Sequence, residues 1–196
     1  MSTAGFTLRH TDPEAASRSR WLAPAPSWGG VIPGLGAVEL RYGNAVGRGD
    51  DFAQVSVAGE RLPQGVFSGI RFGRAPLPAR ARLRVGEHTG TLSRRRSGLS
   101  RDGRALRIGL AGRAYRCRRG QDKRVTELLR QGVVVRVSRD DWSRPVTLDV
   151  RTEGRADAVD LALALLLQGV YTRHLAQGGR WYSLPGRILN RTPDVF

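Results

Sequence analysis

Short segments of alternating apolar and polar residues recur from Ala37 to about Thr152, and Gly, Pro or Asp separates them every eight to twelve residues. Alternation with a period of two is typical of strands that bury one face, and this spacing is typical of antiparallel sandwiches and barrels. The pattern predicts ten strands, at residues 37–42, 53–58, 66–72, 80–86, 88–95, 104–111, 113–119, 124–129, 132–139 and 145–152.

One later segment has a different pattern and predicts a helix at about residues 157–174. Asp157 is a suitable N-cap, Asp160 falls in the first turn, and Leu and Ala dominate the residues that follow. The apolar residues cover most of the helix circumference, which is typical of a helix buried on nearly all sides. The residues expected to be buried are Leu161, Leu163, Leu165, Leu166, Leu167 and Val170.

These patterns together predict a mainly β (α+β) fold. We expect an antiparallel β-barrel or closed sandwich of about ten to twelve strands, wrapped around one buried C-terminal hydrophobic helix. The chain of 196 residues fits a single domain, at residues 37–184, with a tail at 185–196. Residues 1–36 are rich in Pro and Gly and predict an irregular arm. With Trp21 and Trp28, this arm is either an interaction segment or a strap over one end of the barrel.

A barrel of about a dozen antiparallel strands with a hydrophobic helix near its C-terminus resembles the tubby C-terminal-like superfamily. That group includes the tubby proteins, the phospholipid scramblases and the LURP-one-related proteins. The resemblance lies in the order of elements over residues 37–184 and in the helix at residues 158–171, and no sequence motif carries it. It implies binding of phosphoinositide head groups by basic residues on the barrel exterior, as in tubby domains. The calcium-binding segment of scramblases has no counterpart, because the alternating acids of such a loop are missing.

The charge of the chain is concentrated in one stretch. Between Arg71 and Arg124 there are seventeen Arg and Lys residues and three acids, and the whole chain carries a net charge of +16. Such a stretch repels itself in the folded state and attracts polyanions or anionic membranes. Only Lys123 among the 33 basic residues is lysine, a bias typical of a GC-rich, bacterial genome, so the local excess of charge is more informative than the preference for Arg.

The basic stretch predicts an anion-binding patch, provided that the strands bring its residues to one side. The guanidinium group offers a planar fork of donors to phosphate oxygens, and Arg94, Arg95 and Arg96 have the sequence of a basic hairpin tip. The alternative is an ordinary solvated surface. The candidate residues are Arg80, Arg82, Arg84, Arg94, Arg95, Arg96, Arg101, Arg104, Arg107, Arg116, Arg118 and Lys123.

Catalytic and metal-binding signatures are weak in this sequence. A single cysteine, Cys117, excludes an internal disulfide and a Cys-based zinc site, and strand alternation predicts that it is buried. His10, His88 and His174 are far apart along the chain, and the acids at 140–141 are better explained by a turn with a capping Asp. We therefore assign no catalytic residues from the sequence, and we predict no metal site and no cofactor.

The sequence favours a non-catalytic binding module that engages anionic lipid head groups or other phosphate-rich surfaces. One alternative is a small barrel enzyme of the cyclase or isomerase kind, in which the helix walls a hydrophobic pocket. Another is an assembly protein that docks on an acidic partner or binds nucleic acid nonspecifically. No secretory signal precedes the strands, and the longest apolar run is too short to span a bilayer. These features predict a cytoplasmic protein, either free or peripheral at a membrane.

Overall fold

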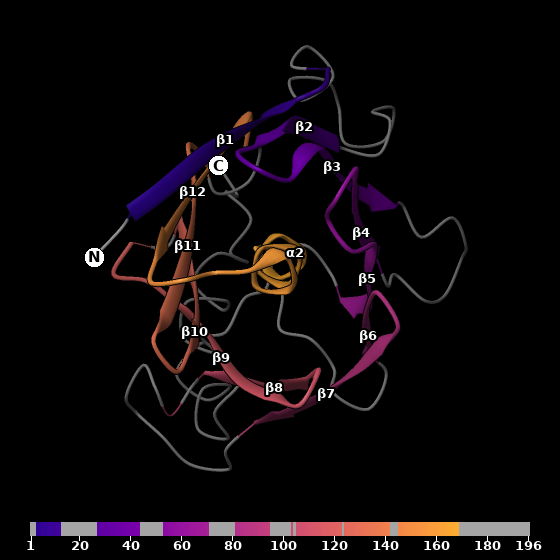
Figure 1. The fold of residues 1–196 in the computed structure, drawn as a ribbon, viewed down its shortest axis with the longest axis vertical. Coiled ribbons are helices and arrows are strands. Elements are labelled where there is room, and N and C mark those ends of the chain that lie inside the picture. The colour runs from indigo at the N-terminus through magenta and orange to yellow at the C-terminus, as the bar shows by residue number, and fades with distance from the viewer. Residues whose placement is uncertain are drawn as a thin grey trace, which may run out of the picture.

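The computed structural model describes residues 3–12, 27–43, 53–70, 81–94, 103, 105–122, 124–141 and 145–168. Twelve antiparallel strands form a closed barrel, as predicted, with one helix (Figure 1). Each strand pairs with its neighbours in the sequence, and β1 pairs with β12 to close the barrel. The strands are β1 (Thr3–His10), β2 (Ser27–Ile32), β3 (Gly36–Gly43), β4 (Ala53–Gly59), β5 (Gly65–Ile70), β6 (Arg82–Val85), β7 (His88–Arg94), β8 (Leu106–Leu110), β9 (Arg113–Arg119), β10 (Val125–Arg130), β11 (Val133–Arg139) and β12 (Thr147–Glu153).

The ten strands from β3 to β12 match the ten predicted segments, but β1 and β2 correct the prediction of an irregular arm at residues 1–36. β1 pairs with β12 over seven residues, from Thr3 opposite Glu153 to Arg9 opposite Thr147. Glycines hide the alternation of β2, and Gly30 is needed there because a Cβ atom would lie 2.6 Å from the Thr7 carbonyl oxygen. Trp21 lies outside the described residues.

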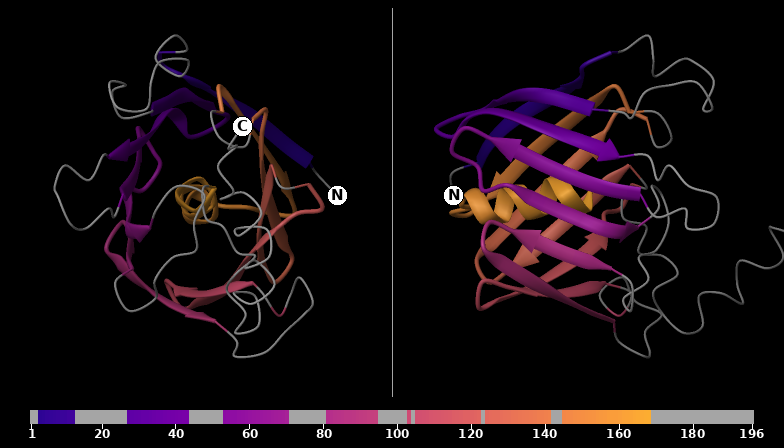
Figure 2. Two further views of the ribbon diagram at one scale, coloured as in Figure 1. Left: turned by 180° about the vertical axis from the view of Figure 1, so that it is seen from behind. Right: turned by 90° about the vertical axis from the view of Figure 1, so that its right-hand side faces the viewer.

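Helix α2 (Ala158–Leu167) lies inside the ring of strands and runs along the barrel axis (Figures 1 and 2). It packs against β4, β5, β6, β10 and β11. Its start agrees with the predicted capping, since the Asp157 carboxylate accepts from the amides of Val159 and Asp160, each at 3.0 Å. The predicted continuation to residue 174, including Val170, lies outside the described residues.

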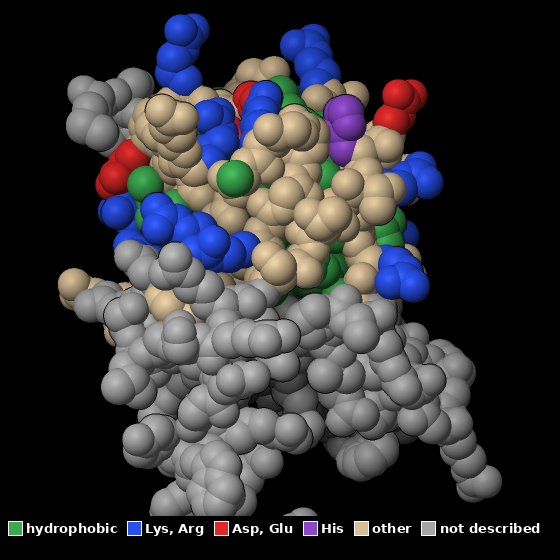
Figure 3. Space-filling model, turned by 90° about the horizontal axis from the view of Figure 1, so that it is seen from below, with side chains coloured by type: hydrophobic (Ala, Val, Ile, Leu, Met, Phe, Trp, Pro, Cys, Tyr) green, Lys and Arg blue, Asp and Glu red, His purple; other side chains and the backbone are tan. Residues whose placement is uncertain are grey.

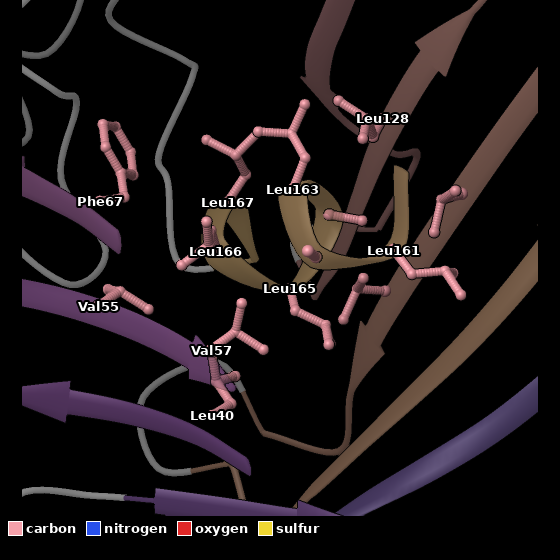
Figure 4. Packing of buried hydrophobic residues seen from close by; sticks show 14 of the residues in the cluster. Leu40, Val55, Val57, Phe67, Leu128, Leu161, Leu163, Leu165, Leu166 and Leu167 are labelled. Carbon is pink, nitrogen blue, oxygen red and sulfur yellow. The ribbon is translucent and has the colours of Figure 1, made fainter. Parts of the chain in front are cut away.

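The leucines of α2 contact apolar side chains of the barrel wall, which Figure 4 shows on either side of the helix. Gly65 on β5 permits one close approach, because a Cβ atom there would lie 2.7 Å from Leu166 Cδ1. The five helix leucines are at most 7% exposed, and the buried wall residues drawn with them include Leu40, Val55, Val57, Phe67 and Leu128. Each such side chain stabilises the fold by roughly 1.5–3 kcal/mol.

A buried polar cluster fixes the N-terminal end of α2 to the barrel wall. The fully buried Asp160 carboxylate accepts from the Tyr115 hydroxyl (3.0 Å) and from Nε and Nη2 of Arg130 (2.8 and 2.7 Å). Arg113 Nη1 donates to Asp157 Oδ2 at 2.5 Å. The hydrogen bond to Asp160 raises the pKa of Arg130, and burial raises the pKa of the Tyr115 phenol. Because β9 and β10 supply these partners, the cluster locates α2 along the axis.

The connections at the two ends of the barrel differ in length. Short turns join neighbouring strands at the end where α2 begins, and Gly112 and Gly132 supply positive φ angles of 72° and 70° in two of them. Longer connections leave the opposite end, including residues 71–81 between β5 and β6 and residues 95–105 between β7 and β8. Within the ranges that the structure describes, no helix is both long enough and apolar enough to cross a membrane.

Truncating the helix core is expected to destabilise the protein strongly. We expect Leu165→Ala to lower the free energy of unfolding by about 2–5 kcal/mol, because it leaves a cavity beside a fully buried helix. Urea denaturation followed by tryptophan fluorescence measures this change. The control Val31→Ala removes methyl groups from a side chain that is 66% exposed and should change the value by less than about 0.5 kcal/mol. Equal effects of the two substitutions would contradict the packing of α2.

Neutralising the carboxylate that holds the helix is also expected to destabilise the fold. Asp160→Asn removes the negative charge and replaces one of the two oxygens that accept from Arg130 by a donating amide, so it should lower the free energy of unfolding by at least about 1.5 kcal/mol. A double-mutant cycle with Tyr115→Phe should give a coupling energy of about 0.5–3 kcal/mol. Glu87→Gln neutralises an exposed acid and serves as the control. A coupling energy near zero would mean that Asp160 does not link α2 to β9.

Candidate anion-binding face

Four of the predicted basic residues lie on the outer surface of consecutive strands. Arg82 and Arg84 belong to β6, Arg107 to β8 and Arg116 to β9, and all four side chains are exposed. Their sequence neighbours point into the core, since the burial of β6 and β8 alternates along each strand. We call the outer surface of β6, β7, β8 and β9 the β6–β9 face. The structure thus brings a third of the predicted set together.

The strand register places two of these arginines side by side. Arg107 lies directly opposite Arg116 on β9, and on its other side it lies opposite Ser93 on β7. Directly opposite residues have Cβ atoms about 4.5–5.5 Å apart. One row of the face therefore consists of Ser93, Arg107 and Arg116, and all three side chains are exposed.

The neighbouring row of the face carries little side-chain bulk. Thr91, Gly109 and Ala114 lie opposite one another across β7, β8 and β9. The Thr91 side chain lies over Gly109, because a Cβ atom there would be 2.7 Å from Thr91 Oγ1. Figure 3 shows this side of the barrel, with arginines in blue around uncharged side chains and backbone. The described neighbours of Arg107 and Arg116 in this row are therefore small.

No carboxylate among the described residues neutralises Arg82, Arg84, Arg107 or Arg116. Arg84 Nε donates to the Gly86 carbonyl at 3.0 Å, and the part of the chain that the structure describes gives Arg82, Arg107 and Arg116 no ion pair. The acid nearest in register is Glu127 on β10. Its carboxylate is already held by Arg118 (2.9 Å) and Arg136 (3.2 Å). The positive charge of the β6–β9 face is consequently left to solvent or to a partner.

Arg118 differs from the other arginines of the predicted patch. It lies opposite Glu127, which lies opposite Arg136, and Arg136 in turn forms an ion pair with Glu153 on β12. The hydrogen bond that Arg136 donates to Glu153, together with the one it donates to Glu127, raises the pKa of Arg136. Arg118, Glu127 and Arg136 therefore form a row of alternating charges across β9, β10 and β11 that stabilises the barrel wall, and Glu153 on β12 extends it diagonally. The partner of Arg118 lies nine residues away along the chain, so only the strand register reveals the pairing.

The remaining predicted anion-binding residues are not placed. Arg94 ends β7 with its backbone opposite Leu106, and its side chain is not described. The others belong to the connections between strands and lie outside the described residues: Arg80, Arg95, Arg96, Arg101, Arg104 and Lys123. They stay predictions. The connection at 95–105 joins the ends of β7 and β8, two strands of the β6–β9 face.

A second polar cluster lies inside the barrel near the C-terminal end of α2. Gln168 Nε2 donates to the Tyr42 hydroxyl at 2.7 Å, and Thr126 Oγ1 donates to the Gln168 carbonyl at 3.1 Å. Trp28 stands edge-on to both His10 and Tyr42, with ring centroids 5.2 and 5.7 Å apart. The sequence did not reveal this cluster, because its residues come from distant strands.

Arg139 is buried at the same end of the barrel. Its exposure is 3%, and burial lowers the pKa of the guanidinium to about 10, while the nearby Tyr42 acts in the opposite direction. The sequence does hold a signal for this residue. Val133, Val135 and Val137 alternate inward along β11, and Arg139 occupies the next inward position.

The other titratable groups singled out in the sequence have structural roles or stand alone. Cys117 is buried, as predicted, and burial raises the pKa of its thiol to about 12, so the thiolate nucleophile is not formed near neutral pH. Asp140 Oδ1 accepts from three backbone amides and holds a turn, in agreement with the capping interpretation. His10 is buried, His88 is exposed, and His174 lies outside the described residues. Within the described ranges, no group of three or more His, Cys, Asp or Glu side chains could hold a metal ion.

The chain matches no protein-family model, no curated protein and no solved structure. The interpretation of the β6–β9 face therefore depends on its own geometry and charge.

Removing one member of the adjacent arginine pair is expected to leave the fold as stable as before or more so. Like charges directly opposite each other on a sheet are destabilising, so Arg116→Gln should raise the free energy of unfolding by up to about 1 kcal/mol. Arg136→Gln breaks two ion pairs but also removes a positive charge directly opposite Arg151, and it should on balance lower the free energy of unfolding by up to about 1 kcal/mol. Urea denaturation at low and high salt tests both, since screening should reduce each effect. A loss of stability in Arg116→Gln as large as in Arg136→Gln would show that Arg116 has a partner.

Proposed function

We propose that this protein is a binding module that attaches to phosphate-bearing anionic surfaces, of which anionic lipid head groups are the favoured case, through its β6–β9 face. One observation carries the proposal: four exposed arginines share this face, and no carboxylate among the described residues neutralises them. In this proposal the protein is cytoplasmic and attaches to the membrane reversibly.

The cost in stability supports the proposal. Holding Arg107 opposite Arg116 is unfavourable for the folded protein on its own. A partner that brings negative charge removes this repulsion, and the guanidinium forks match phosphate oxygens in shape. The connections at 71–81 and 95–105 contain further arginines, which lie outside the described residues. Solubility alone does not require so much positive charge, so binding to an anionic surface would explain the basic stretch.

Lipid head groups fit this face better than nucleic acid does. Proteins that bind single strands usually combine basic residues with exposed aromatic rings on which bases stack. Tyr115, the aromatic residue of β9, points into the barrel and is 1% exposed. The exposed large hydrophobic residues of the described part are Val31 and Val146, and neither lies on this face. We therefore infer a contact with the head-group layer that is electrostatic and inserts no apolar anchor.

The barrel interior supports a binding module in preference to an enzyme with an apolar pocket. The buried leucines of α2 occupy space that such a pocket would need, and they contact both β4–β6 and β10–β11. We also propose a distant relationship with the tubby C-terminal-like superfamily. The closed barrel around a central helix supports it by analogy of architecture alone.

Sedimentation with lipid vesicles tests the proposal. The protein should bind vesicles that contain phosphatidylserine and leave neutral phosphatidylcholine vesicles unbound, and binding should weaken steeply with salt. Changing Arg82, Arg84, Arg107 and Arg116 together to Gln should weaken binding by at least about 100-fold, since each basic residue near an anionic surface contributes about 1 kcal/mol.

A matched variant controls for the loss of charge alone. Arg9, Arg61, Arg151 and Arg155 are exposed residues outside the β6–β9 face, and changing them to Gln removes the same charge. This variant should keep most of the affinity. Equal losses in the two variants, or affinity that does not change with salt, would contradict the assignment of the face. Binding to RNA without binding to vesicles would move the assignment to nucleic acid.

A further inference from the structure

The row formed by Ser93, Arg107 and Arg116 suggests which kind of phosphate the face selects. We propose that this row is a discrete site for a terminal phosphomonoester group, and that it discriminates against phosphodiesters. The inference rests on the proposed function and narrows its ligand class. We call these three residues the phosphomonoester row.

The geometry of the row suits one phosphate group contacted from two sides. Arg107 and Arg116 lie directly opposite each other, so both guanidinium groups can reach a ligand placed above the gap between β8 and β9. Ser93 lies opposite Arg107 on the other side and can donate its hydroxyl hydrogen. Strands hold the three residues in register, so the site is organised before the ligand binds.

The charge of the row favours a doubly charged ligand. Two guanidinium groups stand side by side, and Glu127, the nearest acid in register, is held by Arg118 and Arg136. A phosphomonoester carries about −1.5 to −2 charges at pH 7 and offers three acceptor oxygens. A phosphodiester carries a single charge and offers two free oxygens. The monoester therefore neutralises both arginines and has an additional acceptor oxygen, whereas the diester leaves one of the two positive charges uncompensated.

The surroundings of the row leave room for the rest of the ligand. Gly109 and Ala114 occupy the adjacent positions on β8 and β9, and neither presents a long side chain. Arg82 and Arg84 lie on β6, which is separated from β8 by β7, so their strand is roughly 10 Å from Arg107. They add attraction to any anionic surface but cannot easily share one phosphate with the row. This separation makes them a control on the same face with the same charge.

The inference names a chemical class of ligand. A terminal phosphate occurs on phosphatidic acid and on phosphorylated inositol head groups, and also on small soluble phosphate esters. The backbone of nucleic acids consists of diesters, and so do the head-group links of phosphatidylserine and phosphatidylglycerol. The row is therefore expected to separate anionic lipids of equal charge by the chemistry of their phosphate.

The test compares two kinds of vesicle adjusted to the same zeta potential. One contains phosphatidic acid in phosphatidylcholine, and the other contains phosphatidylserine in phosphatidylcholine. The protein should bind the phosphatidic acid vesicles at least about tenfold more tightly. The double variant Arg107→Gln with Arg116→Gln should lose this preference. The double variant Arg82→Gln with Arg84→Gln should weaken binding to both vesicles and keep the ratio.

Two further measurements sharpen the result. Arg107→Lys with Arg116→Lys keeps the charge but loses the forks, so the preference should fall while binding to phosphatidylserine persists. Glycerol 3-phosphate should displace the protein from vesicles more effectively than glycerophosphocholine, a diester. Binding of glycerol 3-phosphate in calorimetry as tight as vesicle binding would indicate a soluble ester as the ligand, whereas much weaker binding would indicate a lipid.

The outcomes separate this inference from the proposed function. Equal binding to the two vesicles at matched zeta potential, in a salt-dependent manner, would overturn the phosphomonoester row and leave the proposed function intact. Absence of binding to both would overturn the two together. A preference for phosphatidic acid that survives in the Arg107 and Arg116 double variant would also overturn the row, because another part of the chain would then be responsible.

Discussion

The structure depends on filling a closed sheet of twelve strands. A barrel of eight strands is about wide enough for its own side chains to fill, and each further strand widens it. In this protein, helix α2 fills the interior of the barrel, and its leucines complete the core. Its Asp160 accepts hydrogen bonds from Tyr115 and Arg130 of the barrel wall. Apolar contact alone would let a smooth helix slide along the axis. The buried carboxylate, with donors on β9 and β10, gives the helix one position.

The filled interior in turn determines the exterior. Because side chains alternate between the two faces of a strand, the residues that must face α2 and the rest of the core fix which residues face outward. On β8 and β9, Leu106, Ile108, Tyr115 and Cys117 are buried, so Arg107 and Arg116 have to lie outside and opposite each other. A slip of one residue would bury both arginines. The basic face is thus specified by the same pattern that builds the core.

Much of this fold could be predicted from the alternation, and the failures have physical causes. The strands from β3 to β12 follow their own sequence pattern, whereas glycines interrupt the alternation of β1 and β2. β1 is defined by pairing with β12, about 140 residues later, which a local pattern cannot reveal. For the candidate site, too, one part could be predicted from the local sequence and another part could not. The outward direction of Arg107 is readable locally, but the ion pair that sets Arg118 apart depends on which strand lies beside β9.

The placement of acids, more than the number of arginines, argues for a partner at the β6–β9 face. A genome bias toward arginine would add basic residues on every side of the barrel without sorting their neighbours. In the described part, Glu127 and Glu153 compensate arginines on β9 to β11, while Asp157 and Asp160 compensate Arg113 and Arg130. The face that contains Arg107 and Arg116 lacks this compensation, as do four exposed arginines elsewhere in the described part, Arg9, Arg61, Arg151 and Arg155. On this face, however, two such arginines lie directly opposite each other and neither has a described acid as a partner. An acid at position 114 would lie diagonal to Arg107 and two residues from Arg116 along β9, and the chain has Ala114 there instead. On the β6–β9 face, arginines that form no ion pair with a described residue lie next to small side chains. This arrangement suits a ligand that supplies the negative charge.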